Sequence, residues 1–353
     1  MKNRLLFVKL NRLFKGFMLV GFAALLLPIN VNAADKNFNG DITISLAGDC
    51  SIGSLSIHSY DNSFDQMYDL EGPEYFFGGV KDVFLNDDMT LVNFEGVLTT
   101  STELVEKQYN IKGKPEYINV INGSGIDAVS FGNNHRIDYG EQGITDTINA
   151  FKSISLPYAY DTNVGIYKTK QGVRVGYVSV NEVYDKTLVE DFLQKGIADL
   201  RAQNVDLILT CCHWGDEGTH KVNSYQKELG HKCVDWGADL VIGCHPHVLQ
   251  GIEKYNDDYI IYSLGNFCFG GNKNPKNKDS MIIQCRFNFK DGKYTKNQSM
   301  NVIPCSISSV TSRNDYRPTV LTGKKAKSLL TKMNSYCSGF NTSVSMDGSV
   351  ITK

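Results

Sequence analysis

Short apolar runs alternate with amphipathic stretches along most of the chain. Runs rich in β-branched residues predict buried strands, and apolar residues at three- and four-residue spacing predict helices. Because the two kinds of segment alternate, the pattern predicts an α/β or mixed α+β domain around a central sheet. Strands are predicted at residues 41–47, 90–94, 127–131, 165–170, 173–180, 206–211, 240–243 and 259–264, an edge hairpin at 281–289 and 300–307, a loop at 48–53, and helices at 76–85, 143–154, 188–203, 222–237 and 324–333.

Polar residues stand where several of these predicted strands end. In sheets of this kind, ligands bind beyond the carboxyl ends of the strands. We therefore expect the polar side chains to form one site, drawn from segments between residue 49 and residue 266. The residues are Asp49, Glu95, the run Asn133-Asn134-His135, His213 with Asp216 and Glu217 shortly after it, the pair His245 and His247, and Asn266.

The pair His245 and His247 is the most informative part of this set. It follows the apolar run 238–242, with Pro246 between the two histidines. In extended backbone, residues two apart point to the same side, so both imidazoles are expected to face one point. Neutral imidazole is the commonest metal ligand in proteins.

Each remaining residue has an ordinary structural explanation when it is considered alone. Asp49 fits a turn residue, and His135 and His213 each fit a buried, hydrogen-bonded imidazole. Glu95 ends an apolar strand, where a carboxylate is costly unless it is paired or coordinated. Together, the histidines, the Asn-His pair and the acids predict a metal site for one or two ions of zinc, manganese or iron. Asn133, Asp216, Glu217 and Asn266 are expected beside the ligands or against the substrate.

Composition narrows the class of protein. The chain has 353 residues, of which 42% are hydrophobic and 21% charged, as in a globular protein. Its formal net charge is -2, but residues 1–33 hold five basic residues and no acid, so the rest carries -7. An acidic body argues against a nucleic-acid binder. The nine cysteines include no CxxC pair. We expect mostly buried thiols, with one disulfide as an alternative that the sequence does not assign.

The N-terminal segment reads as an export signal. A basic stretch precedes an apolar run at 16–29 and the small-residue sequence Val31-Asn32-Ala33. The run is short for a membrane span, although an uncleaved anchor is the alternative. We therefore expect a periplasmic or extracellular protein, either released or held at the membrane by this segment. The expected organisation is a signal at 1–33, a main domain at 34–310 and a helical extension of it at 311–353.

Six sequence blocks in this order and spacing resemble those of the bacterial capsule-synthesis CapA family, the poly-gamma-glutamate capsule proteins. That family is similar to calcineurin-like metallophosphoesterases. The resemblance implies a metallophosphoesterase-like sandwich of two β-sheets flanked by helices. The blocks are Leu-Ala-Gly-Asp at 46–49, Val-Asn-Phe-Glu-Gly at 92–96, Gly-Asn-Asn-His-Arg-Ile-Asp-Tyr-Gly at 132–140, His-Trp-Gly-Asp-Glu at 213–217, Gly-Cys-His-Pro-His-Val-Leu-Gln at 243–250 and Tyr-Ser-Leu-Gly-Asn-Phe at 262–267.

The resemblance also implies roles for the site residues. His135 would stand outside the metals as a general acid, and Ser51 replaces a histidine that is usually a metal ligand in the metallophosphoesterases. This departure puts the first metal, and ordinary two-metal hydrolysis, in question. The implied ligands are Asp49 and His247 for the first metal, Glu95 bridging both, and Asn134, His213 and His245 for the second.

Two functions follow as hypotheses. The first is an exported, metal-dependent hydrolase of capsule or surface-polymer synthesis, in which metal-activated water attacks a phosphoester or an amide of an anionic polymer. The second is a non-catalytic metal-binding partner in a membrane-associated polymer synthesis or export complex, which the serine at position 51 favours. A secreted protein that binds a polyanion without chemistry is a third reading, which the acidic body disfavours.

Overall fold

The computed structural model describes residues 37–183 and 186–353. The predicted signal at 1–33 lies outside the described residues. Within the described part, no helix is both long enough and apolar enough to span a bilayer.

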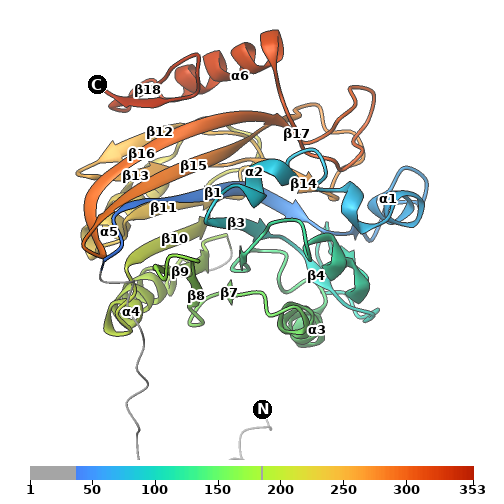
Figure 1. Ribbon diagram of the computed structural model, residues 1–353. Helices are drawn as coiled ribbons and strands as arrows, with labels where there is room; N and C mark the ends of the chain where they lie inside the picture. Colours follow the sequence, from blue (N-terminus) through green and yellow to red (C-terminus); the bar gives the residue numbers. More distant parts are fainter. Residues whose placement is uncertain (1–36, 184–185) are drawn as a thin grey trace, which may run out of the picture. The chain divides into compact units, whose positions relative to one another are not determined.

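The larger of two main sheets contains eight strands (Figure 1). Their order is β17-β16-β15-β1-β3-β6-β7, and β14 pairs with β1 beside this path. Strands β1, β3, β6 and β7 are parallel, whereas β15 runs antiparallel to β1. The strands are β1 (Gly40–Ser51), β3 (Met89–Phe94), β6 (Ala128–Ser130), β7 (Tyr158–Ala159), β14 (Asn266–Phe269), β15 (Asp279–Lys290), β16 (Lys293–Ser306) and β17 (Thr319–Val320).

The second main sheet has six strands in the order β12-β13-β11-β10-β9-β8. Its four central strands are parallel, and its two edge strands run antiparallel to their neighbours. The strands are β8 (Gly165–Lys168), β9 (Arg174–Asn181), β10 (Leu207–His213), β11 (Leu240–Cys244), β12 (Ile252–Tyr255) and β13 (Asp258–Ile261), and small sheets are formed by β2 (Ser54–Leu55), β4 (Val97–Leu98) and β5 (Ile111–Gly113) and by β18 (Thr342–Val344) and β19 (Val350–Thr352).

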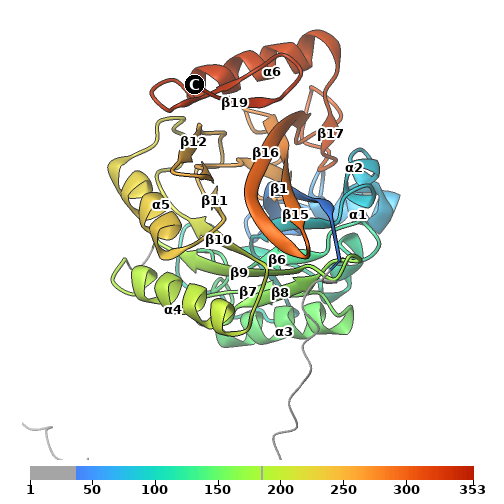
Figure 2. The same cartoon turned by 60° about the vertical axis from the view of Figure 1, so that its left-hand side comes forward.

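Helices cover the outer faces of both sheets (Figure 2). Apolar residues of α4 and α5 pack on the second sheet, and those of α1, α2 and α3 pack on the larger one. Helix α6 packs beside β16 and β18. The helices are α1 (Phe64–Glu71), η1 (Pro73–Tyr75), α2 (Lys81–Leu85), η2 (Pro115–Val120), α3 (Gly140–Ser153), α4 (Val189–Ala202), α5 (Ser224–Trp236) and α6 (Gly323–Tyr336).

Strand β1 shows how the sequence builds these layers. Ile42, Ile44 and Leu46 belong to the core shared with the second sheet, whereas Ala47 and Cys50 belong to the core under α1 to α3. Alternation of side chains along a strand explains Ala47, and the irregular register between Ala47 and Asp49 explains why Cys50 faces the same side as Ala47. The prediction of two sheets flanked by helices is therefore confirmed, and all nine cysteines are buried free thiols.

Three local predictions are wrong. The segment 76–85 forms a helix only at α2, because turns occupy residues 76–80. The hairpin of β15 and β16 does not lie at the sheet edge, because β15 pairs with β1 and β16 with β17. The expected loop at 48–53 begins late, because β1 continues to Ser51 through an irregular register between Ala47 and Asp49.

Candidate metal centre

The strand-end residues predicted from the sequence meet where parallel strands of both sheets finish. Asp49 lies near the end of β1, and Glu95 follows β3 directly. The Asn133-Asn134-His135 run follows β6, and His213 is the last residue of β10. His245 and His247 follow β11, and Asn266 begins β14 beside Asp49.

Glu95 is the centre of the arrangement. Its side chain is fully buried, and within the described residues neither carboxylate oxygen has a hydrogen-bond partner. The Nε2 atoms of His213, His247 and His135 lie 3.7, 3.8 and 3.9 Å from Oε1. These distances are too long for hydrogen bonds. They suit a cation between the groups, because zinc binds nitrogen and oxygen ligands at about 2.0–2.2 Å. The donor set therefore fits a divalent metal.

Asp49 and His247 complete a first set of donors around Glu95. One ligand atom from each of these three residues lies within 4.8 Å of the other two. His247 Nδ1 lies 3.2 Å from Asp49 Oδ2 and 2.9 Å from Asn266 Oδ1. Asn93 Nδ2 donates to Asp49 Oδ1 at 2.7 Å, which orients the carboxylate. The interactions hold both carboxylate and imidazole in place before any ligand arrives.

A second set of donors lies around His213. Its Nε2 is 2.8 Å from Asn134 Oδ1, and its ring centroid is 4.8 Å from that of His245. The Nδ1 atom of the buried His245 has no hydrogen-bond partner within the described residues. A buried ring nitrogen without a partner is costly, and coordination would remove that cost.

The two acids after His213 differ in position. Glu217 is exposed, and one of its oxygens lies within 4.8 Å of a ring nitrogen of His245 and of His247. Asp216 instead accepts a hydrogen bond from Asn223, the N-cap of α5, at 3.0 Å. The structure thus brings Glu217 to the histidines and directs Asp216 to the start of the next helix.

His135 is held by a network that the sequence analysis missed. Its Nδ1 hydrogen-bonds to Asp138 at 2.7 Å. The buried Asp138 also pairs with Lys107 at 2.5 Å and accepts from the Ile111 backbone at 2.6 Å. Asp138 stands in the same sequence block as His135, three residues later, which was the available signal. Asn93 likewise stands in the block at 92–96, whereas Lys107 comes from a loop outside every block, where no local pattern singled it out.

Burial and the close spacing of the acids and imidazoles shift several pKa values in the site. Burial raises the pKa of Glu95 well above its ordinary value, and Asp49 adds to the shift. Burial and the neighbouring His245 hold the pKa of His213 well below its ordinary value, and burial with His247 lowers the pKa of His245 to about 4. For His247, burial acts downward but Glu95 and Asp49 outweigh it and raise the pKa to about 10. Two of these histidines are thus neutral at pH 7, the form that binds metals.

The backbone of the histidine pair differs from the prediction. His245 and His247 have positive φ angles of 94° and 57°, so the pair is not extended, and strand geometry is not what brings the rings together. Their ring centroids are 5.8 Å apart. Positive φ is unfavourable for a side chain other than glycine, and such strain is concentrated at functional sites.

Ser51 occupies the position where the metallophosphoesterase pattern has a ligating histidine. Its side chain is fully buried, and its Oγ has no hydrogen-bond partner within the described residues. A serine hydroxyl is a shorter and weaker donor group than an imidazole. The first donor set therefore has one fewer nitrogen than the resemblance would supply.

Comparisons with known proteins place the chain among capsule-synthesis proteins. Residues 43–271 match the family described as bacterial capsule synthesis protein PGA_cap. The capsule biosynthesis protein CapA of Bacillus anthracis is 29% identical over 271 residues, which cover 70% of this chain and 64% of that protein. The PGA biosynthesis protein CapA of Bacillus subtilis is 27% identical over 273 residues, which cover 70% of this chain and 69% of that protein. This chain thus spans slightly less than two thirds of the first of these relatives.

Among solved structures, the calcineurin-like phosphoesterase YfkN from Bacillus subtilis is 18% identical. The superposition has a TM-score of 0.49 and covers 79% of this chain and 95% of that one.

Proposed function

Because this chain belongs to the bacterial capsule synthesis family PGA_cap, we propose that it is an exported, metal-dependent hydrolase that acts on an anionic cell-envelope polymer. The scissile bond is a phosphoester or an amide. One observation carries most of the proposal: the buried Glu95 carboxylate has three imidazole nitrogens around it and no hydrogen-bond partner among the described residues. A divalent cation satisfies such a carboxylate and is the usual catalyst of hydrolysis at such sites.

The donors divide between two cation positions. When bound, the cations supply a water of lowered pKa and neutralise charge on the substrate. Glu217 lies beside two of the histidines and is the acid best placed to make up for the missing imidazole at Ser51. The proposed ligands are Asp49, Glu95 and His247 for one position and Asn134, His213 and His245 for the other, with Glu95 shared.

His135 is the proposed proton-transfer residue. Asp138 holds its Nδ1, so its Nε2 is the atom turned toward Glu95, at 3.9 Å. Burial lowers the pKa of His135, although the hydrogen bond to Asp138 opposes the shift. An incoming anionic substrate favours the imidazolium form, so a bound substrate prepares His135 to protonate the leaving group.

Metal content is the first test. We expect about two ions per chain by mass spectrometry of the purified protein, and their loss in a His245→Ala, His247→Ala double variant. A His58→Ala variant, altered outside the site, should keep them. Folded wild-type protein that holds no metal after exposure to zinc, manganese and iron would contradict the proposal.

A non-catalytic role in polymer synthesis or export is the second candidate, and the unpartnered serine at position 51 is the observation that favours it. Substitution of His135 separates the two candidates. A hydrolase with His135→Ala loses activity toward bis(4-nitrophenyl) phosphate or poly-gamma-glutamate while it keeps its metal and its melting temperature. A scaffold protein shows no hydrolysis in either form.

A further inference from the structure

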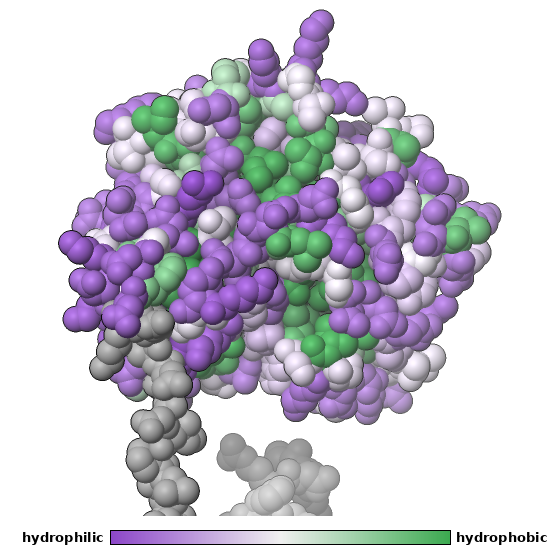
Figure 3. Space-filling model, in the orientation of Figure 1, coloured by the Kyte–Doolittle hydropathy of each residue, from purple (hydrophilic) through white to green (hydrophobic). Residues whose placement is uncertain are grey.

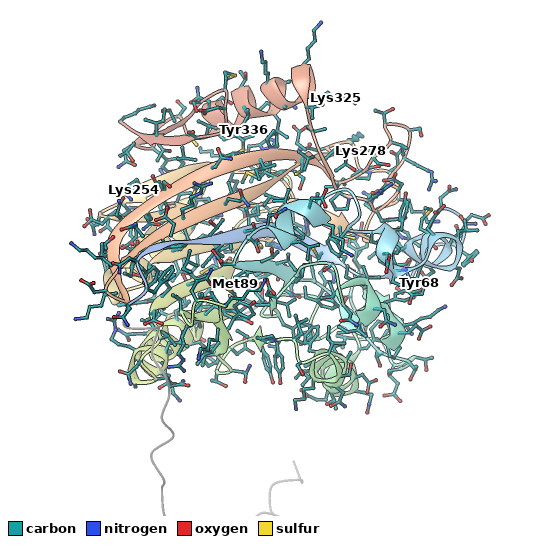
Figure 4. The ribbon with its side chains drawn as sticks, viewed as in Figure 1. Tyr68, Met89, Lys254, Lys278, Lys325 and Tyr336 are labelled. Carbon is teal, nitrogen blue, oxygen red and sulfur yellow. The ribbon has the colours of Figure 1, made fainter. Side chains whose placement is uncertain are left out.

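A polar cavity that contains none of the residues of the metal centre lies beside the first half of α6. Its volume is about 850 Å³, and it is lined by the segments 274–279, 306–311 and 319–332. We call it the lysine groove. In Figure 4, Lys325 and Lys278 lie at the same end of α6, near β17. In Figure 3, hydrophilic side chains project from the region that α6 occupies in Figure 1.

The groove is strongly basic although the chain is not. Its lining includes five lysines and one acid, Asp279, in a chain with a formal net charge of -2. Asp279 is already paired with Lys332 at 2.6 Å. The groove therefore keeps an excess of positive charge after the ion pair between Lys332 and Asp279 has formed.

Three of the lysines are left for a ligand. The Lys278 ammonium donates to the carbonyl oxygens of Thr311 at 2.8 Å and Arg313 at 2.6 Å, which ties down the 306–313 loop. The exposed Lys276, Lys324 and Lys325 have no ion-pair or hydrogen-bond partner among the described residues. Like charges gathered along one cavity repel, and a bound polyanion relieves that repulsion.

The start of α6 adds to the same effect. The helix begins at Gly323 without a side-chain cap and has no acid in its first turn. Lys324 and Lys325 stand at its positive end, where cations are unfavourable and anions are favoured. An anion in the groove meets the two ammonium groups together with the uncapped N–H groups of the first turn.

The groove is also joined to the metal centre by a short piece of chain. The Phe269 ring lies 5.1 Å from the His247 ring. The chain passes from Phe269 to Asn274, in the groove wall, in five residues, which span at most about 18 Å when fully extended. Asn274 therefore lies within about 18 Å of Phe269, a distance that a linear polymer of a few residues can span.

We propose that the lysine groove binds a linear polycarboxylate and holds the anionic polymer on which the metal centre acts. The volume is in the range of ligand sites and far exceeds a single carboxylate or phosphate. Ser328 offers a hydroxyl group to the polar backbone of such a chain, whereas the hydroxyls of Ser306 and Thr319 already donate to the carbonyl oxygens of Ser308 at 2.8 Å and Arg317 at 3.0 Å. Lysine ammoniums suit separate carboxylates spaced along a polymer, because they act as point charges rather than as planar forks. The identity of the polymer rests on the proposed function.

Binding of fluorescent poly-gamma-glutamate, measured by anisotropy in EDTA at low salt, tests the groove without hydrolysis. The test variant combines Lys276→Glu, Lys324→Glu and Lys325→Glu. The control combines Lys195→Glu, Lys290→Glu and Lys293→Glu, which are exposed lysines outside the groove with the same change in charge. We expect the test variant to bind about tenfold more weakly or worse, a change of about 1.4 kcal/mol, and the control to lose far less.

Variants with Gln or Arg at the three groove positions guard against a folding defect. The Gln variant should also bind weakly, and the Arg variant should bind normally, both with wild-type melting temperatures. Equal weakening in test and control, no binding by the wild type, or binding only to phosphatidylglycerol vesicles would overturn the proposal.

The same variants separate this inference from the proposed function. If the groove variants lose binding but the metal-loaded wild type never cleaves the polymer, the groove is supported as a binding site and the hydrolase function is contradicted. If the groove variant cleaves the polymer with an unchanged rate and Michaelis constant, the groove proposal is contradicted and the hydrolase function is supported.

Discussion

The effect of Glu95→Gln on the free energy of unfolding is predicted to change sign when metal is added. Without metal the variant should be at least as stable as wild type, and with metal it should be less stable. The side chain is fully buried, its oxygens lack hydrogen-bond partners among the described residues, and the nearest ring nitrogens are 3.7–3.9 Å away. Burial raises the pKa of this carboxyl well above its ordinary value, so the charge is unfavourable without a cation. Glutamine keeps the size and removes the charge.

The expected magnitudes follow from these contacts. A buried polar group without a partner costs about 1–3 kcal/mol and a charged one costs more. Glutamine keeps the polar atoms and removes only the extra cost of the charge, so metal-free Glu95→Gln should be at least as stable as metal-free wild type. With metal at about 100 times its Kd, wild type should gain about 2.7 kcal/mol. The variant should gain almost none, because an amide is a poor ligand beside a carboxylate.

Chemical denaturation in EDTA and in excess zinc or manganese measures both differences, with metal content determined on the same samples. Glu103→Gln is the matched control, since that side chain is exposed. A metal-free Glu95→Gln protein clearly less stable than metal-free wild type would refute the reasoning, because it would mean that the carboxylate is stabilised without a cation. Equal stabilisation of both proteins by metal would refute Glu95 as a ligand.

Three further predictions use other parts of the structure. Asp138→Asn should lower the free energy of unfolding by about 3 kcal/mol, because it breaks the buried ion pair with Lys107, and hydrolysis should fall while metal content is kept. Gly48→Ala should cost about 3 kcal/mol in denaturant titrations, because the new Cβ would lie 1.9 Å from the Gly265 carbonyl oxygen. Burial raises the pKa of Asp87 from 3.8 to about 7, so the folded protein retains a proton that the unfolded chain loses, and stability should fall as pH rises from about 4 to about 7. Asp87→Asn should flatten that fall, and a steeper fall in the variant would contradict the pKa shift.

The periodicity of the chain was enough to locate most strands and helices. The alternation of strands and helices also predicted the class of fold, because each amphipathic segment must bury one face against another layer. Where the local signal was weak, the predictions failed. Residues 76–80 form turns although they are largely apolar and aromatic, and the short strand β14 was missed inside a segment read as a strand end.

The residues of the candidate site likewise include some that the sequence identified and others that only the structure revealed. Strand-end position identified Glu95, His135 and His213, because the carboxyl ends of parallel strands meet at one edge. Strand-end position could not identify Asn93 or Lys107, because they reach the site from a strand interior and from a loop. The left-handed backbone of the histidine pair was equally hidden.

The sequence by itself determined the layers of this protein and the polar residues at their ends. Those properties depend on the local spacing of apolar and polar residues, which is present in the sequence before the chain folds. Only the tertiary structure decided that Glu95 lacks a partner, that Glu217 approaches the histidines, and that Lys276 shares a groove with Lys325. Such relations depend on how two sheets and a distant helix pack, because packing brings together side chains that are far apart in the chain.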